Sequence, residues 1–304
     1  MSRTYKTTGI ILKAIPMGEA DRLVTVLTPE SGLVRAIAPG ARKHKSRLGG
    51  RTGLFVINEL LLSKGKSLDK IIQAETVRSF PALSTDLGRL TASQYLSELV
   101  LCEAVSEVPQ GELYRFIVAF FERLEQVATA QVLAELAQAV VQVLRLGGVA
   151  PEVYQCCVTG ATIQPALDNP SWRVGFSAVG GGVVTLAAMG QLESGESSGV
   201  SESGYRPRRK IGLNTQINAS ELIILQELCR SELVLGLDGS LTSEIGPDAW
   251  GTDVWAELGT HPAAFELWRR IERILRQYAQ YHLDRTIRSA ALIDTCFSTP
   301  VYAS

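Results

Sequence analysis

The chain of 304 residues has little of what catalytic and metal-binding proteins use. It contains three histidines, none in a paired metal-binding spacing, and five cysteines, an odd number that does not fit a disulfide framework. No run approaches the ~20 consecutive apolar residues that span a bilayer, and the N-terminus lacks the apolar core of a signal peptide. We therefore expect a cytoplasmic protein with no cofactor, no bound metal and no membrane contact.

Catalytic motifs are equally scarce. Residues 195–199 match the G-x-S-x-G pattern, but they lie in Ser/Gly/Glu-rich sequence rather than between a strand and a helix. Residues 65–67 (GKS) resemble the end of a phosphate-binding loop, yet the upstream position that needs glycine holds Leu60. No tight acidic cluster suggests a two-metal nuclease. The sequence therefore favours a protein that is not an enzyme. A hydrolase ranks third, behind the two non-enzymatic functions given at the end of this section.

What the chain does have is an uneven distribution of charge. The formal net charge is −1, but residues 1–80 carry 14 Lys and Arg against 6 Asp and Glu, a net of +8. The remaining residues therefore carry a net of −9. Such asymmetry indicates that the first segment is built for an anionic partner.

The first eighty residues read as short strands rich in Val, Ile, Leu and Thr, separated by Gly and Pro turn signals. The expected strands are 8–15, 22–28, 33–38, 54–62 and 70–77. Five short strands, with one long basic connection between the third and the fourth, fit a five-stranded OB-fold barrel. An SH3-like barrel is the neighbouring alternative.

Beyond residue 80 the apolar residues recur at helical spacing. Helices are expected around 90–105, over 113–126 and 128–146, from a capping box at 218–221 through 235, and as one long final helix over 265–289. The predicted fold class is α+β and multidomain, an OB-fold barrel followed by an α-helical domain. The expected domains are 1–80 (OB-fold, DNA-binding), 81–150 (helical domain, first part), 151–190 (degenerate zinc-ribbon-like insertion), 191–210 (flexible Ser/Gly/Glu loop with a basic end) and 211–304 (helical domain, second part).

The insertion at 151–190 has the layout of a four-cysteine zinc site, with two knuckles and a glycine turn between them. Its four ligand positions, however, hold Cys156, Thr159, Thr185 and Ala188. A single thiolate, even beside Cys157, cannot provide tetrahedral coordination. We therefore expect a ribbon that is held by packing and binds no zinc.

The strongest functional signal is the run GARKHKSRLGG at residues 40–50. Its Lys and Arg side chains suit sequence-independent contact with phosphates, and its glycines let the backbone follow a phosphate chain. The alternative is a solvated surface loop of the kind most charge runs form. The DNA-binding residues we predict are Arg35, Arg42, Lys43, Lys45, Arg47, Arg51, Lys64, Lys66, Arg208 and Arg209.

A second basic feature lies in the final helix, where Arg269, Arg273 and Arg276 run beside apolar residues. Cations next to an apolar slot suit an acidic peptide that ends in an aromatic residue. We predict that these three arginines bind such a partner peptide, with Ile271, Ile274 and Leu275 lining the slot. The alternative is a solvated helix face.

Four segments together resemble the bacterial RecO family of recombination mediator and strand-annealing proteins: residues 7–50, 56–80, 144–160 ("LRLGGVAPEVYQCCVTG") and 274–294. The resemblance implies an OB barrel, a helical domain and a zinc-ribbon-like insertion, although only Cys156 matches the family's zinc ligands. It also implies binding of single- and double-stranded DNA, strand annealing, and recombinase loading on the nucleoid. The implied partners are RecR and the acidic C-terminal tail of the single-strand-binding protein. The alternative function is a non-enzymatic scaffold whose basic patches bind acidic protein tails.

Overall fold

The computed structural model describes residues 4–188, 214–230, 233–235, 241–243 and 262–298. The predicted Ser/Gly/Glu loop, with Arg208 and Arg209 at its basic end, lies outside these ranges. The chain divides into two compact units. The first comprises 1–132, 234–242 and 287–304, and the second comprises 133–233 and 243–286.

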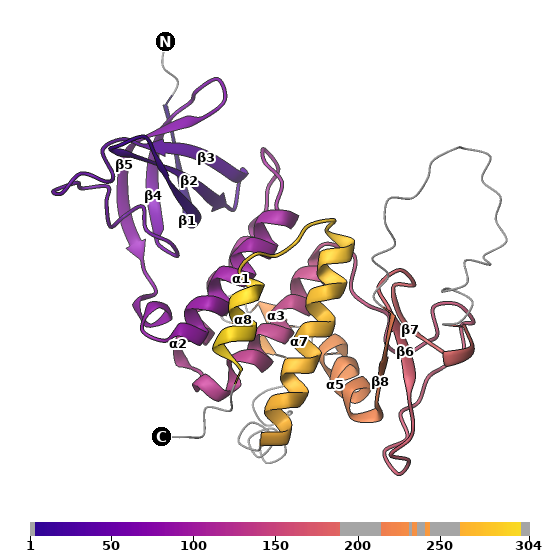
Figure 1. Ribbon diagram of the computed structural model, residues 1–304. Coiled ribbons are helices and arrows are strands. Elements are labelled where there is room, and N and C mark those ends of the chain that lie inside the picture. Colours follow the sequence, from indigo (N-terminus) through magenta and orange to yellow (C-terminus); the bar gives the residue numbers. More distant parts are fainter. Residues whose placement is uncertain (1–3, 189–213, 231–232, 236–240, 244–261, 299–304) are drawn as a thin grey trace, which may run out of the picture. The chain divides into compact units, whose positions relative to one another are not determined.

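The first unit begins with a closed five-stranded barrel (Figure 1). Its strands are β1 (Thr4–Met17), β2 (Asp21–Thr28), β3 (Gly32–Ala38), β4 (Ile57–Ser63) and β5 (Asp69–Arg78). The order around the barrel is β1-β2-β3-β5-β4, and only β3 and β5 pair in parallel. The predicted OB-fold barrel is therefore confirmed.

The five strands lie close to their expected positions. β1 begins four residues earlier than expected, whereas β4 begins three residues later. We expected this strand to begin at Leu54, but it begins at Ile57. Phe55 has a φ of +63° and donates its amide to Ile11 O at 2.8 Å, so the backbone turns there instead of extending. The turn buries the Phe55 ring, which packs edge-on against Phe121.

Side chains along a strand point alternately into the barrel and toward solvent, and this alternation determines which residues are buried and which are exposed. In β3, Val34, Ala36 and Ala38 are buried in the core cluster, whereas Arg35 between them is exposed. Register pairs Arg35 with Thr25 of β2, and Ala36 with Asp69 of β5. The outer face of β2 and β3 therefore presents Arg35 toward solvent.

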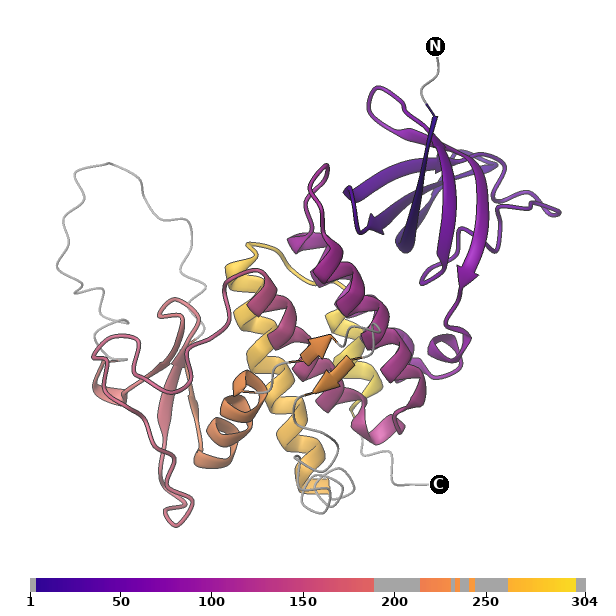
Figure 2. The ribbon, with the colours of Figure 1, turned by 180° about the vertical axis from the view of Figure 1, so that it is seen from behind.

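Helices complete the first unit. They are α1 (Leu87–Glu103), α2 (Gly111–Gln126) and the short α8 (Ala290–Cys296), with 3-10 turns η1 (Pro81–Ser84) and η2 (Thr129–Gln131). Asp86 caps α1 by accepting from Arg89 N at 2.8 Å. α8 lies beside α1 in both views (Figures 1 and 2), and the Phe297 ring that follows α8 packs over Gly88.

The second unit contains three longer helices and a small sheet. Its elements are α3 (Val132–Leu146), β6 (Val174–Ser177), β7 (Gly182–Val184), β8 (Asn214–Ile217), α5 (Ala219–Arg230) and α7 (Pro262–His282). The sheet has the order β7-β6-β8. A separate ribbon, in which β9 (Leu233–Leu235) pairs with β10 (Leu241–Ser243), falls mostly within residues 234–242 of the first unit. The predicted capping box is confirmed, because Asn218 and Glu221 each accept from the other's backbone amide, at 2.9 and 2.8 Å.

Two helix ends differ from prediction. α5 ends at Arg230 rather than continuing to residue 235. The single helix expected over 265–289 is wrong, because α7 ends at His282 and α8 begins at Ala290. Asp284 adopts a φ of +48°, which a continuing helix excludes, and the Glu98 carboxylate accepts from the amides of Arg288 and Ser289 at 3.0 Å.

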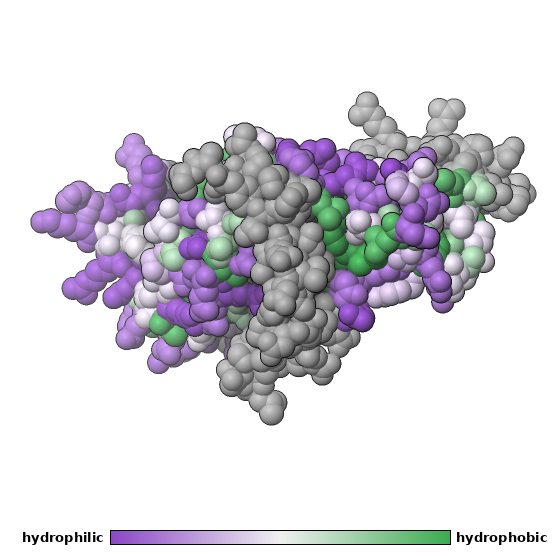
Figure 3. Space-filling view, turned by 90° about the horizontal axis from the view of Figure 1, so that it is seen from below, coloured by the Kyte–Doolittle hydropathy of each residue, from purple (hydrophilic) through white to green (hydrophobic). Residues whose placement is uncertain are grey.

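Figure 3 shows the molecule from below. Much of the described surface on this face is hydrophilic, with smaller hydrophobic patches. Among the described helices, none combines the length and the apolar character needed to cross a membrane.

Candidate nucleic-acid interface

The long connection between β3 and β4 contains residues 40–53, which we call the basic loop, and one arginine ties this loop to the barrel. Arg22 of β2 donates from Nη1 to Gly49 O, Thr52 O and Thr52 Oγ1 at 3.0, 3.0 and 3.1 Å. At the start of the loop, Gly40 N donates to Asp21 Oδ1 at 2.8 Å. The loop therefore has a defined path, anchored at both ends by side chains from the beginning of β2.

The predicted cations of the basic loop fall into two groups. Lys43, Lys45 and Arg47 are exposed, and within the described part of the chain they have no acidic partner. Arg42 and Arg51 are also exposed, but each donates to a backbone carbonyl, Gly18 O and Ala74 O, at 2.7 Å. Three cations therefore point their charge at solvent, while two also hold the loop against neighbouring turns and strands.

Arg22 is a residue that reasoning from the sequence missed. It is the only basic residue of β2, and its guanidinium fork suits several carbonyls at once. A signal was present in retrospect, because a long glycine-containing loop with many backbone carbonyls needs donors to hold it. The sequence alone could not show that Arg22 faces that loop.

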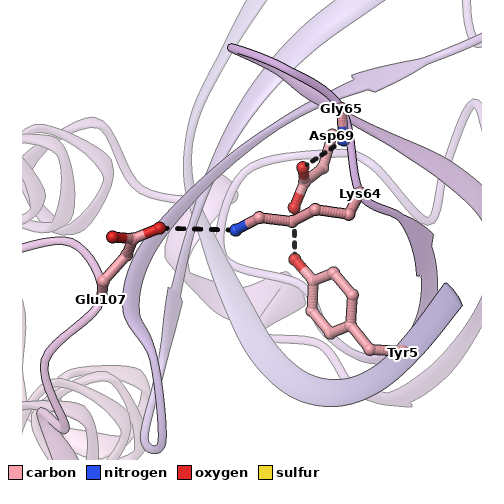
Figure 4. Close-up of polar contacts among 5 residues, drawn as sticks. All are labelled: Tyr5, Lys64, Gly65, Asp69 and Glu107. Atoms are coloured by element: carbon pink, nitrogen blue, oxygen red, sulfur yellow. Dashed lines mark hydrogen bonds and ion pairs between the residues drawn. The ribbon is translucent and has the colours of Figure 1, made fainter. Parts of the chain in front are cut away.

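A second basic element is the connection between β4 and β5, residues 64–68, which we call the KGK loop. Asp69 organises it: one carboxylate oxygen accepts from Gly65 N at 2.9 Å, and the other accepts from the Tyr5 hydroxyl (Figure 4). Burial, together with the bond to Asp69, raises the pKa of Tyr5 above its ordinary value. A Cβ on Gly65 would come within 1.8 Å of Leu68 O, so the turn that presents Lys64 and Lys66 requires glycine.

Arg35 lies on β3 between these two elements. Arg35 lies three residues before the end of β3, where the basic loop begins, a separation of about 10 Å along a strand. Pairing of β3 with β5 brings the residue that follows the KGK loop, Asp69, next to Ala36. The outer face of strands 2 and 3, together with the loop between strands 4 and 5, is where OB-folds bind oligonucleotides.

A groove of about 570 Å³ runs between β3, the KGK loop and the turn that joins α1 to α2. Arg35 and Lys64 are among its lining residues. Lys64 Nζ lies 3.5 Å from the carboxylate of Glu107, which belongs to that turn (Figure 4). Of the predicted cations on this side of the barrel, Lys64 is thus the one that faces an acidic side chain.

The arginines of α7 are placed differently from expectation. Arg269 pairs with Glu266 at 2.8 Å, and Arg276 is buried and pairs with Glu272 at 3.2 Å, whereas Arg273 is exposed. The expected apolar slot beside them is wrong: all three of its residues belong to the core of the second unit. These are Ile271, Ile274 and Leu275.

The degenerate zinc-knuckle positions do come together in the second unit. Cys156 Sγ accepts from Thr185 N at 3.3 Å, and Ala188 N donates to Thr185 Oγ1 at 3.3 Å. Burial raises the pKa of the Cys156 thiol, but hydrogen bonds from Thr159 and Thr185 outweigh it and bring the pKa to about 6. Across the described residues, no three His, Cys, Asp or Glu side chains are grouped as a metal site would need.

Comparison with known proteins gives one consistent result. The family model described as "Recombination protein O N terminal" matches residues 1–80, and "Recombination protein O C terminal" matches residues 84–191. The DNA repair protein RecO of Gloeothece citriformis is 48% identical over 296 residues, which cover 97% of this chain and 98% of the relative. The proteins of the same name from Nostoc punctiforme and Synechococcus elongatus are 44% and 41% identical, over 98% and 100% of both chains. A closed OB barrel with a basic face, followed by helices, and full-length similarity at this level show that the chain belongs to the RecO family of DNA repair proteins.

Proposed function

We propose that the protein binds single- and double-stranded DNA through the basic side of its barrel, without sequence preference. The observation that carries this proposal is the set of exposed cations on the basic loop, which meet no acid among the described residues and stand on a loop held in place by Arg22. Arg35 and the KGK loop add further exposed cations to the same OB-fold barrel. Lys and Arg that reach phosphates bind any sequence alike, because the backbone carries the same charge everywhere.

Strand annealing follows from the same charges. Two complementary strands repel each other through their phosphates, and cations that neutralise part of that charge lower the cost of bringing them together. Base pairing then finds the register without covalent chemistry, so we propose that the protein is not an enzyme. We also propose that it acts in the cytoplasm, on the nucleoid, and assists recombinase loading together with RecR.

The test is annealing of complementary oligonucleotides, bare and coated with single-strand-binding protein, with and without RecR. The wild type should accelerate annealing, and replacing Lys43, Lys45 and Arg47 by Ala should slow it. A matched variant that replaces Arg115, Arg285 and Arg288 by Ala removes the same formal charge elsewhere and should anneal like the wild type. Equal losses in both variants would assign the effect to net charge, and no DNA binding by the wild type at low salt would refute the function.

We propose separately that the second unit binds the acidic tail of the single-strand-binding protein through Arg273, which is exposed on α7, and Arg269 next to it. Arg276 serves the fold instead, because it is buried against Glu272. Replacing Arg273 by Glu should weaken the binding of a labelled tail peptide in fluorescence anisotropy at low salt. Unchanged affinity would exclude α7 as the peptide site.

A further inference from the structure

The turn between α1 and α2, residues 104–110, is held against the β2–β3 turn by its backbone. Leu33 N donates to Val105 O at 3.1 Å, Glu107 N donates to Ser31 O at 2.9 Å, and Gln110 N donates to Pro29 O at 2.8 Å. Gly32 has a φ of +61°, and a Cβ there would come within 1.9 Å of Val105 O. The close approach of the two turns therefore depends on a glycine and on main-chain hydrogen bonds.

The backbone hydrogen bonds leave the side chain of Glu107 with no part in holding the turn. The side chain is 83% exposed, and its carboxylate lies 3.5 Å from Lys64 Nζ, whose side chain is 54% exposed. An ion pair this exposed contributes little to folding. Glu107 also adopts a φ of +63°, a conformation that costs free energy for any residue other than glycine. Glu107 therefore contributes little to the stability of the fold, although its carboxylate lies next to Lys64, a predicted DNA-binding cation.

The groove is lined by cations and serines as well as by apolar residues. Besides Arg35 and Lys64, its lining includes Ser31, Ser67 and Ser106, together with Leu33 and Val34. Both carboxylate oxygens of Asp69 are already engaged, with Gly65 and with Tyr5. Glu107 is thus the lining acid whose carboxylate is directed at an exposed cation (Figure 4). Cations and hydroxyls in this arrangement suit a phosphodiester.

We propose that this groove takes a DNA phosphate and that Glu107 competes with that phosphate for Lys64. The inference rests on the proposed DNA binding, to which it adds an acid of the protein itself that competes with the DNA phosphate. A carboxylate on Lys64 must be displaced before a phosphate can pair with the ammonium group, so Glu107 lowers affinity for the backbone at this point. Strands held here exchange more readily than on the basic loop, whose exposed cations face no acid in the described part of the chain.

The test compares Glu107→Gln with Glu112→Gln. Glu112 is an exposed acid in the first turn of α2 that does not line the groove, so both changes add the same charge to nearby positions. Glu107→Gln should tighten binding of a single-stranded oligothymidylate by roughly two- to fivefold at low salt, the range expected for an exposed pair, and the gain should fade as salt screens it. Glu112→Gln should change affinity much less.

A second arm asks whether the effect passes through Lys64. In a Lys64→Ala background, Glu107→Gln should no longer tighten binding, because the contested cation is gone. A gain that persists in that background, or equal gains from Glu107→Gln and Glu112→Gln, would overturn the competition while leaving DNA binding intact. Failure of the wild type and every variant to bind the oligonucleotide would overturn both this inference and the proposed function.

Discussion

The basic loop and helix α7 carry similar numbers of cations and treat them in opposite ways. On the loop, Lys43, Lys45 and Arg47 project into solvent from a backbone that is tied down at both ends. On α7, acids three residues before Arg269 and four residues before Arg276 pair with these arginines, and the second pair is buried. The cations of the loop are therefore available to a partner, whereas most cations of the helix are paired with acids within the second unit.

The difference teaches that a count of basic residues does not measure a binding surface. On a helix, an acid three or four residues before a cation lies beside it and can pair with it. When the cation is buried, leaving its charge unpaired is strongly unfavourable. A loop rich in glycine has no such geometry, and its cations stay available unless another element supplies an acid. The KGK loop is the intermediate case, because Glu107 reaches Lys64 from a distant part of the chain.

The largest expected effect is on the stability of the helix. Replacing Glu272 by Ala removes an acid that pairs with the buried guanidinium of Arg276, and breaking a buried pair from one side costs about 3–5 kcal/mol. Urea unfolding should show this loss in the free energy of unfolding. The control is Glu266→Ala, which removes the exposed partner of Arg269 and should cost less than about 1 kcal/mol. If the two variants lost similar amounts of unfolding free energy, the proposed difference between the buried and the exposed ion pair would be wrong.

The next effect concerns DNA affinity. Removing Lys43, Lys45 and Arg47 should reduce the slope of log K against log salt for single strands by about 2, which corresponds to a loss of about one hundredfold at 0.1 M salt. The variant should unfold like the wild type, because these side chains are exposed, whereas Arg22 and Asp21 hold the loop. Replacing Arg269 and Arg273 by Ala should leave the slope almost unchanged. A slope that is unchanged in the loop variant would show that the loop does not touch phosphates.

A smaller effect distinguishes anchoring cations from binding cations. Arg22→Ala removes the donor to three oxygens of the basic loop and should lower the free energy of unfolding by about 2 kcal/mol, measured by chemical denaturation. Lys13→Ala, an exposed change on β1, should have little effect on stability. Arg22→Lys should rescue only in part, because an ammonium group lacks the planar fork. Full rescue by lysine would mean that charge alone, and not the fork, holds the loop.

The smallest expected effect is that of metal removal. Cys156 is the only sulfur among the four knuckle positions, and hydrogen bonds from Thr185 and Thr159 already occupy it. We expect well under one zinc per chain by elemental analysis and no change in melting temperature on chelation. About one tightly held zinc per chain would show a ligand set that includes residues outside those described.

Much of the architecture could be read from the chain. Alternation of apolar residues and clear turn signals located all five barrel strands, and the long connection after the third strand favoured an OB-fold while leaving an SH3-like barrel as the alternative. The Asn218–Glu221 capping box began α5 where expected, because its two hydrogen bonds join residues three apart. The same reasoning failed at 283–289, where the break depends on Glu98, a residue almost two hundred positions away.

What the sequence by itself determined is therefore the local pattern: strand periodicity, helix caps, the concentration of positive charge in the first eighty residues, and the loss of the zinc ligands. Only the tertiary structure decided which cations are available. Arg22 anchors the loop, Arg276 is buried against Glu272, and Glu107 meets Lys64 across 43 residues of chain. The physical reason is that periodicity acts between neighbours in sequence, whereas the neutralisation of a charge depends on whichever acid or carbonyl the folded chain brings within a few ångströms.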